Sequence, residues 1–492
     1  MAPPPDKPMV DMAYTTEKAE LVNNVDLESA HARALTRRIL WKMDTRILPV
    51  LALLFLCSFL DRTNVGNARL YGLEKELGMD LQDKQYDQGL AVFYATYIVS
   101  EVPSNLVLKR VTPRVWLPFL TFAWGVVSMC QGFVRNFAGF VSVRAVLGLT
   151  EGGLLPGMIL YLSGLYTRRE LALRIGLFYT AASLSGAFGG LLARGLSELA
   201  GHGGYSAWRW IFIIEGLITI AAAIVAGALL PNGILGASFL TDKEKVHAVQ
   251  RLRRAVSAGT INPEHEADEK FSWHEVGRAV FSWQTWLSAC AYFGILAGLY
   301  SFGLFLPTII AALGHTANAA QLWSVIPYAV ASVVTVIVAF ASDHFQVRGI
   351  IMLVTMPIAI AGYAVIANVE SANVKYGMTF LMATGLYSSV PPVLGWLANN
   401  SAGHYKRATA AALQLAIANA GGFVTVFVYP SPQGPQFHKG HTIILSLLVA
   451  GWFMILGNVL YCAKVNRDKA RGRYDEYIGS GDDRDPSFRL VL

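Results

Sequence analysis

Residues 46–66 read RILPVLALLFLCSFLDRTNVG. Between Ile47 and Leu60 the only polar side chain is that of Ser58. A helix needs about 20 predominantly apolar residues to cross the roughly 30 Å hydrocarbon core of a bilayer, so this stretch predicts a transmembrane helix. Asp61 and Arg62 follow the apolar part directly, which places two charged side chains at or inside the membrane.

The same kind of apolar run recurs along the chain. The runs before residue 231 are 87–108, 115–134, 139–165, 174–197 and 208–230, and those after residue 282 are 284–311, 319–341, 350–368, 375–399, 408–430 and 441–463. With 46–66 they predict about twelve transmembrane helices. The expected fold class is therefore an all-α membrane protein with two six-helix halves of similar layout.

The composition agrees with a chain that lies mostly in lipid. Hydrophobic residues make up 54% of the 492 positions and charged residues 15%, whereas soluble domains carry about 25% charged residues. The net charge of +7 is spread between apolar runs rather than gathered on one face, so nucleic acid is not an expected partner. The expected surroundings are a lipid bilayer.

One polar stretch separates the two halves and sets the domain boundaries. The expected units are a polar N-terminal tail (1–45), a first half (46–230), a connector (231–282), a second half (283–464) and a C-terminal tail (465–492). A short amphipathic helix is expected at 241–256 of the connector. Lys and Arg concentrate in alternate loops that include the connector, which predicts a multi-pass protein with both termini in the cytoplasm. We expect it to lie in the plasma membrane.

Two other classes of membrane protein find little support in the sequence. The chain has no G-x-x-x-x-G-K-[ST] phosphate loop, so a pump driven by ATP through such a loop is not expected. Histidines such as His202, His247 and His404 are scattered, so neither a metal site nor a catalytic site is indicated. We therefore expect a transporter without cofactors, not an enzyme, with its site between the halves.

Charged side chains within the apolar runs are the strongest candidates for that site, because such groups are costly in a membrane. Arg144 and Glu151 are separated by seven residues, about two helical turns, and so share one helix face. Together with Asp61 and Arg62 they are expected to form one buried cluster. Two guanidinium groups suit an organic anion, because each can hold a carboxylate through two hydrogen bonds. The alternative is a set of ion pairs that only holds helices together.

The remaining candidates divide into proton carriers and polar groups of the second half. Carboxylates that are buried away from solvent bind protons more readily and can carry them. This role is expected of Asp61, Glu151 and Glu101, whereas Glu215 is interpreted as structural. Tyr292, Tyr300, Tyr387 and Asn419 place polar tips on apolar helices of the second half. The expected substrate-binding residues are Arg62, Arg144, Tyr300, Tyr387 and Asn419.

Several segments resemble the anion:cation symporter family of the major facilitator superfamily, in particular its fungal allantoate, nicotinate and vitamin permease branch. They are LDRTNVGNAR (60–69), EVPSN (101–105), RAVLGLTEGGLLPG (144–157), YTRREL (166–171), SGAFGG (185–190), WRWIF (208–212), FLT (239–241), WLANN (396–400) and GHYKR (403–407). The resemblance implies a major facilitator fold and transport by alternating access. It also implies that Arg62 and Arg144 contact the substrate while Asp61 and Glu151 handle protons.

The expected function is secondary active transport, namely proton-coupled import of a small organic anion such as a carboxylate, a vitamin or a ureide, by a protein that works as a monomer. Two alternatives stay open at this stage. One is an exporter of a secondary metabolite or toxin on the same fold, and the other is a nutrient-sensing receptor without transport.

Overall fold

The computed structural model describes residues 10–80, 84–257, 273–312, 317–429, 437–480 and 482–492. Within these ranges the regular elements are helices and no strand is found. Residues 258–272 of the expected connector lie outside the described residues. The all-α class predicted from the apolar runs is therefore confirmed.

The helices follow the order expected from the sequence. The first half contains α1 (Val10–Leu70), α3 (Gln85–Arg110), α4 (Pro113–Gln131), α5 (Phe137–Glu151) with α6 (Leu154–Ser163), α7 (Arg168–Ser197) and α8 (Ala207–Leu229). The second contains α12 (Trp283–Ala312), α13 (Ala317–Phe345), α14 (Arg348–Ile366), α15 (Ala372–Asn399), α16 (His404–Val428) and α17 (His438–Ala470). Ten spans among the described helices are long and apolar enough to cross a membrane. Helices α3 and α4 complete the twelve, packed against α5 and α8 respectively.

The two halves meet along several helix pairs. Helix α7 packs on α13 and α15, α3 on α16, and α1 on α12. Gly186 of α7 lies so close to the Tyr328 ring of α13 that a Cβ atom there would overlap it. Small residues allow such close approach between helices in a membrane. The interface between the halves therefore runs through the centre of the bundle, where α1, α3, α12 and α16 present side chains to one another.

The run 139–165, expected as one helix, is bent in the structure. Helix α5 ends at Glu151, and α6 begins at Leu154 after two glycines. A Cβ atom on Gly152 would overlap Ser100 and the Tyr97 carbonyl of α3, so only glycine fits there. The break leaves Glu151 in the last turn of α5, where it faces α1.

The connector contains the short helix expected at 241–256, observed as α9 (Asp242–Ser257). Thr241 and Glu244 cap its first turn: the Thr241 N–H donates to the Glu244 carboxylate, and the Glu244 N–H donates to the Thr241 hydroxyl. Both Glu244 carboxylate oxygens also accept hydrogen bonds of 2.8 Å from Lys42 Nζ of α1, which holds the pKa of Glu244 below its usual value. The connector is thereby fixed to the first half.

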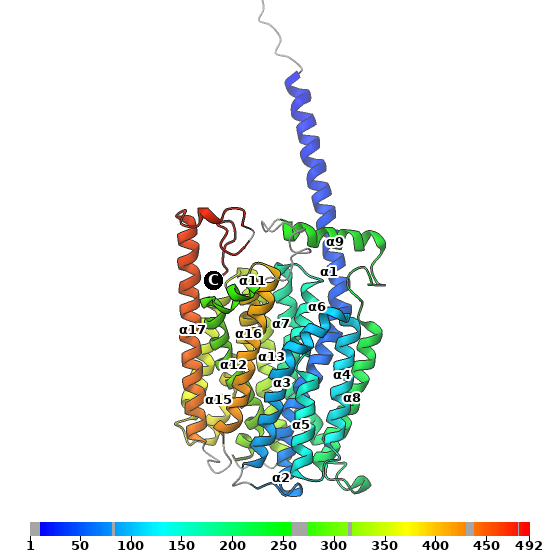
Figure 1. The fold of residues 1–492 in the computed structure, drawn as a ribbon, viewed down its shortest axis with the longest axis vertical. Coiled ribbons are helices and arrows are strands. Elements are labelled where there is room, and N and C mark those ends of the chain that lie inside the picture. Colours follow the sequence, from blue (N-terminus) through cyan, green and yellow to red (C-terminus); the bar gives the residue numbers. More distant parts are fainter. Residues whose placement is uncertain (1–9, 81–83, 258–272, 313–316, 430–436, 481) are drawn as a thin grey trace, which may run out of the picture.

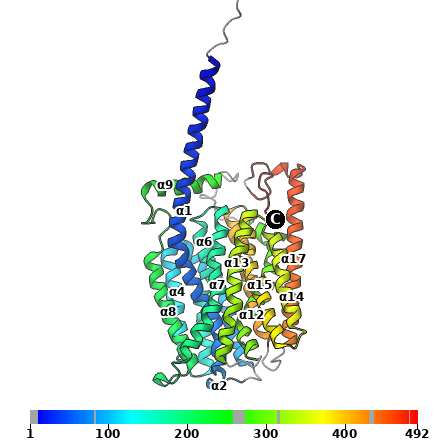
Figure 2. The same cartoon turned by 180° about the vertical axis from the view of Figure 1, so that it is seen from behind.

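The start of α1 at Val10 and the C-terminus lie at the same end of the bundle (Figure 1). Figure 1 shows α9, α11 (Trp273–Val280), the projecting start of α1 and the C-terminus at one end, with the short α2 (Leu73–Glu76) at the other. Figure 2 gives the same arrangement from behind. Helix α1 continues without interruption through the boundary expected at 45/46. The shared side of the two termini agrees with the loop charges, and its cytoplasmic identity stays a prediction.

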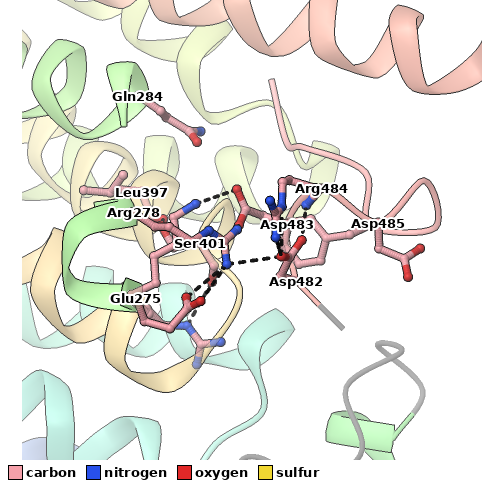
Figure 3. Close-up of polar contacts among 12 residues, drawn as sticks. Glu275, Arg278, Gln284, Leu397, Ser401, Asp482, Asp483, Arg484 and Asp485 are labelled. Atoms are coloured by element: carbon pink, nitrogen blue, oxygen red, sulfur yellow. Dashed lines mark hydrogen bonds and ion pairs between the residues drawn. The ribbon is translucent and has the colours of Figure 1, made fainter. Parts of the chain in front are cut away.

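The segment after α17 folds back onto the second half. Figure 3 shows Arg278 of α11 beside Asp482 and Asp483. Asp483 accepts from Arg278 at 2.8 Å and from Lys406 at 2.6 Å. Further along, the backbone N–H of Val491 donates to Asn400 Oδ1 at 2.7 Å, and Asn400 Nδ2 donates to the Val491 carbonyl at 2.9 Å. These contacts join the segment to α11, α15 and α16.

Asp483→Ala should loosen this segment. The change removes the acceptor of two partly buried ion pairs, each worth about 0.2–1 kcal/mol. The two pairs together contribute about 0.4–2 kcal/mol, so in purified protein tryptic cleavage after Arg484 should become about 2- to 30-fold faster. Asp475→Asn, at an exposed carboxylate, is the matched control and should cleave at the wild-type rate. Equal cleavage of both variants would show that the ion pairs do not hold the segment.

Candidate functional site

An ion pair between α1 and α5 lies in the middle of the bundle. Arg62 Nε donates to Glu151 Oε1 at 2.7 Å, and Arg62 Nη2 lies 2.7 Å from the same oxygen. Ser58, one turn earlier on α1, donates a third hydrogen bond of 2.6 Å to that atom. The Glu151 side chain has no exposed surface, and its second oxygen, Oε2, has no hydrogen-bond partner. Oε1 of Glu151 therefore has three polar contacts, whereas Oε2 has none.

Arg144 lies two turns before Glu151 on α5 and is 2% exposed. Its guanidinium stacks over the Phe93 ring of α3, 4.6 Å from the centroid. Nε and Nη1 are buried without a hydrogen-bond partner, and no salt bridge joins Arg144 to any described residue. A buried cation is costly unless it is paired. The geometry therefore marks Arg144 as a group that can take an anionic ligand.

A chain of hydrogen bonds leads from Arg62 into the second half. Arg62 Nη1 donates to the Tyr300 hydroxyl at 2.8 Å, and Tyr300 donates to Asn419 Oδ1 at 3.1 Å. Asn419 Nδ2 in turn donates to Glu101 Oε2 of α3 at 3.3 Å. Glu101 is 1% exposed, and its other oxygen has no hydrogen-bond partner. Four helices, two from each half, thus share one buried network.

Asp61 lies next to Arg62 in the chain but points elsewhere. Its carboxylate accepts from Trp124 Nε1 at 2.8 Å and from Ser128 Oγ at 2.7 Å, both on α4. Successive residues of an α-helix are about 100° apart, so neighbours cannot both face the centre. The structure therefore joins Arg62 directly to Glu151, whereas the carboxylate of Asp61 is bound by α4.

Tyr387 and Tyr292 lie in the second half, outside the hydrogen-bond chain. Both are 1% exposed, and the Tyr387 ring lies 5.9 Å from that of Tyr328. Their position leaves the assignment of Tyr387 as a substrate-binding residue a prediction. Tyr292 is likewise a buried aromatic of α12.

Several residues of the site were missed by the sequence reasoning. Phe93 and Tyr97 of α3 lie against the guanidinium groups, with Arg144 4.6 Å from the Phe93 centroid and Arg62 4.6 Å from the Tyr97 centroid. Tyr94 packs on Tyr300 instead, with the two ring centroids 5.1 Å apart. Their signal was the spacing of Phe93, Tyr97 and Glu101, which repeats every four residues and so marks one helix face. Ser58 gave no signal, because a lone serine in an apolar run is common.

Tyr300→Phe should weaken the link between the halves. The substitution keeps the ring that packs on Tyr94 but removes the hydroxyl that joins Arg62 to Asn419. A hydrogen bond to a charged group contributes about 1.5–3 kcal/mol, so the rate of transport should change about 10- to 150-fold. The measurement is initial uptake rate in proteoliposomes, with Tyr461→Phe, at an exposed tyrosine of α17, as control. An unchanged rate would show that the hydroxyl is not needed.

The arrangement suits binding of an anion. Among the described residues, no group of three or more His, Cys, Asp and Glu side chains is placed to hold a metal ion. The site instead offers two guanidinium groups, aromatic walls and carboxylates with free oxygens, all shielded from water. Charged hydrogen bonds are strong in such surroundings.

Comparison with known proteins places the chain among transporters. The family model described as Major Facilitator Superfamily matches residues 51–426. An uncharacterized transporter of Schizosaccharomyces pombe is 34% identical over 96% of this chain and 94% of its own length. A high-affinity nicotinic acid transporter of Saccharomyces cerevisiae is 30% identical over 92% of this chain and 85% of its own.

Solved structures show the same fold. The xylose transporter XylE from E. coli, in a partially occluded inward open conformation, superposes with a TM-score of 0.63 and 15% identity over 84% of this chain and 99% of its own. A likeness at that identity speaks for the fold alone. Together with the family match and the full-length relatives, it shows that this chain belongs to the Major Facilitator Superfamily and is a multi-pass membrane transporter.

Proposed function

We propose that this protein imports a small organic anion together with protons. The observation that carries the proposal is Arg144, a fully buried guanidinium with two unpartnered nitrogens, beside an Arg62 that is held by a carboxylate. A carboxylate ligand fits Arg144 because a buried guanidinium with open donors is stabilised by an acceptor that carries negative charge. Carboxylates, carboxylated vitamins and ureides are the substrate classes to test first.

Charge balance gives the reason for coupling to protons. Arg62 and Arg144 carry two positive charges, and Glu151 with Asp61 can carry two negative charges, so the centre of the first half is neutral when empty. An anion that enters adds a negative charge, which is costly in a low-dielectric interior. A proton on Glu151 restores neutrality and frees Arg62 to hold the ligand together with Arg144. Loaded and empty carriers are then both neutral at the centre and can both reorient.

The link between the halves supplies a way for the ligand to affect reorientation. A ligand that draws Arg62 away from Glu151 also changes its hydrogen bond to Tyr300, and with it the contact from Asn419 to Glu101. These bonds join the half that holds the anion to the half that moves against it. Glu101 is therefore the proposed third proton carrier, where a proton changes the contact of α3 with α16.

The nicotinic acid transporter among the relatives supports an organic anion as substrate, since its name states that it carries a carboxylic acid. The test is a proteoliposome panel of carboxylates, vitamins and ureides under an imposed pH gradient. The expected result is saturable accumulation of one class when the outside is acidic. If accumulation of the substrate is driven only by an outward gradient of a second anion and does not respond to pH, proton coupling is contradicted. Transport in the opposite direction under the same gradient would instead indicate an exporter.

A further inference from the structure

Residues 482–492, the C-terminal segment, are held by their backbone at one end of the second half. Asn466 of α17 donates from Nδ2 to the Leu490 carbonyl at 2.8 Å and accepts from the Leu490 N–H at 2.9 Å. Asn400, which follows α15, holds Val491 in the same two-way manner. Each side-chain amide therefore pairs with both polar backbone groups of one residue, as paired residues of an antiparallel β-sheet do.

Other donors of the same helix ends bind the segment at its carbonyl groups. Trp396 Nε1 of α15 donates to the Val491 carbonyl at 2.8 Å, and the Gly349 N–H at the start of α14 donates to the Leu492 carbonyl at 3.1 Å. The Lys469 ammonium of α17 donates to three further backbone carbonyls, those of Asp483, Asp485 and Phe488, at 2.6, 3.1 and 2.6 Å. The ends of α14, α15 and α17 together thus bind a peptide backbone.

The groups that bind the segment are themselves buried. The side chains of Trp396, Asn400 and Lys469 are at most 5% exposed. A buried donor that loses its partner costs free energy, because it has given up its contact with water. Leu490 is buried as well, so the segment contributes an apolar side chain in addition to its backbone. The helix ends are therefore built to be occupied by this peptide.

Helix α15, which receives three of these hydrogen bonds, is interrupted by two prolines. Pro391 and Pro392 lie inside the helix, and each lacks the N–H that would complete a helical hydrogen bond. Helices bend most readily at such positions. Trp396 and Asn400 lie beyond the prolines, so the segment binds the part of the chain that such a bend would move.

The prolines also lie at the contact between the two halves. A Cβ atom on Gly176 of α7 would lie only 3.5 Å from Cβ of Pro391. Helix α15 packs on α7 of the first half, whereas α14 and α17 pack chiefly on other helices of the second half. The segment thus joins the end of a helix at the contact between the halves to two helices behind it. Bending of that end requires the bonds to the segment to break.

We propose that the ends of α14, α15 and α17 form a peptide-binding site whose ligand is the C-terminal segment of the same chain, and that its occupancy restrains α15 from bending at Pro391 and Pro392. The segment then acts as a removable strap on the side of the site formed by the second half. The proposal goes beyond the transport of an anion with protons and does not depend on the substrate.

The test is hydrogen exchange of backbone amides, followed by mass spectrometry on the full-length protein in nanodiscs without substrate. Truncation after Ser480 removes all three bonds to α15, each of which changes an equilibrium about 2- to 13-fold. Amides of residues 393–399 should therefore exchange at least about tenfold faster, because bending opens their helical bonds. Amides of 373–387, before the prolines, should keep the wild-type rate.

Val491→Pro is the second variant, and it leaves the helices themselves unchanged. It removes the N–H that donates to Asn400, so exchange at 393–399 should become about 2- to 13-fold faster. Arg489→Ala is the matched control, because it removes an exposed side chain of the segment and keeps the backbone bonds. It should exchange like the wild type.

A synthetic peptide with the sequence of residues 482–492 shows whether the strap is removable. Added to the truncated protein, it should slow exchange at 393–399 towards the wild-type rate, whereas the same peptide with Val491→Pro should be at least twofold less effective.

Three results would overturn the proposal. Unchanged exchange at 393–399 in both variants would show that the segment does not restrain α15. An equal increase at 373–387 would show a general loss of stability instead of bending at the prolines. A wild-type peptide that has no effect on the truncated protein would show that the segment is a fixed part of the fold and not a ligand. Failure of proton-coupled import would leave all of these measurements unaffected, since no substrate enters them.

Discussion

Arg144→Ala should abolish saturable uptake while the protein still folds and inserts. The substitution removes the buried guanidinium that has no partner in the empty carrier. Losing a buried charge pair with a ligand costs about 3–5 kcal/mol, so uptake efficiency should fall by about two to four orders of magnitude. The measurement is initial uptake rate against substrate concentration in proteoliposomes. Arg194→Ala, at an exposed arginine of α7, is the matched control and should transport normally.

Two further variants separate a binding role for Arg144 from a structural one. Arg144→Lys keeps the charge but loses the planar pair of donors, so it should retain part of the uptake with weaker apparent affinity. Arg144→Met removes an unpaired buried charge, so its thermal stability without ligand should equal or exceed that of the wild type. A structural ion pair predicts the opposite, namely a large loss of stability. Normal uptake by Arg144→Ala would remove Arg144 from the site.

Glu151→Gln should abolish accumulation driven by protons while it leaves exchange of substrate intact. The amide oxygen can still accept from Ser58 and Arg62, so the local structure is kept, but the side chain can no longer bind and release a proton. Uptake under a pH gradient should stop when the substrate concentrations inside and outside are equal. Counterflow into preloaded vesicles should continue at a rate similar to that of the wild type. The ratio of the two activities is therefore the measurement that reports coupling.

Glu198→Gln provides the control for this second experiment. Glu198 follows the end of α7 and is exposed, so its loss should change neither accumulation nor exchange. If Glu151→Gln still accumulates substrate along the pH gradient as the wild type does, the proton is carried elsewhere. Loss of both accumulation and exchange would instead indicate that Glu151 is needed to bind substrate or to hold Arg62 in place.

Much of the fold could be predicted from the sequence because the bilayer constrains it strongly. A chain that crosses hydrocarbon must satisfy its backbone within each segment, so apolar runs of sufficient length become helices. The runs were located in this way, whereas the connector helix α9 was predicted from its amphipathic pattern. The spacing of Arg144 and Glu151 also placed them on one face of α5, since helical geometry alone fixes that relation.

Contacts between helices could not be predicted in the same way. The break after Glu151 arises because Gly152 and Gly153 pack directly on α3, and a run of apolar letters does not report such packing. Glu215 gave no signal beyond its charge, because the absence of a partner is visible only once neighbouring helices are in place. The attachment of the C-terminal segment to Arg278 and Lys406 likewise joins residues far apart in the chain.

The sequence by itself determined that residues 46–66 begin a twelve-helix membrane protein and that charged side chains lie within its helices. Only the tertiary structure decided which of those charges meet. Arg62 and Asp61 are adjacent in the chain, yet Arg62 faces Glu151 and the second half while Asp61 faces α4. The physical reason is that a helix turns by about 100° per residue, so the packing of neighbouring helices selects the partner of each side chain.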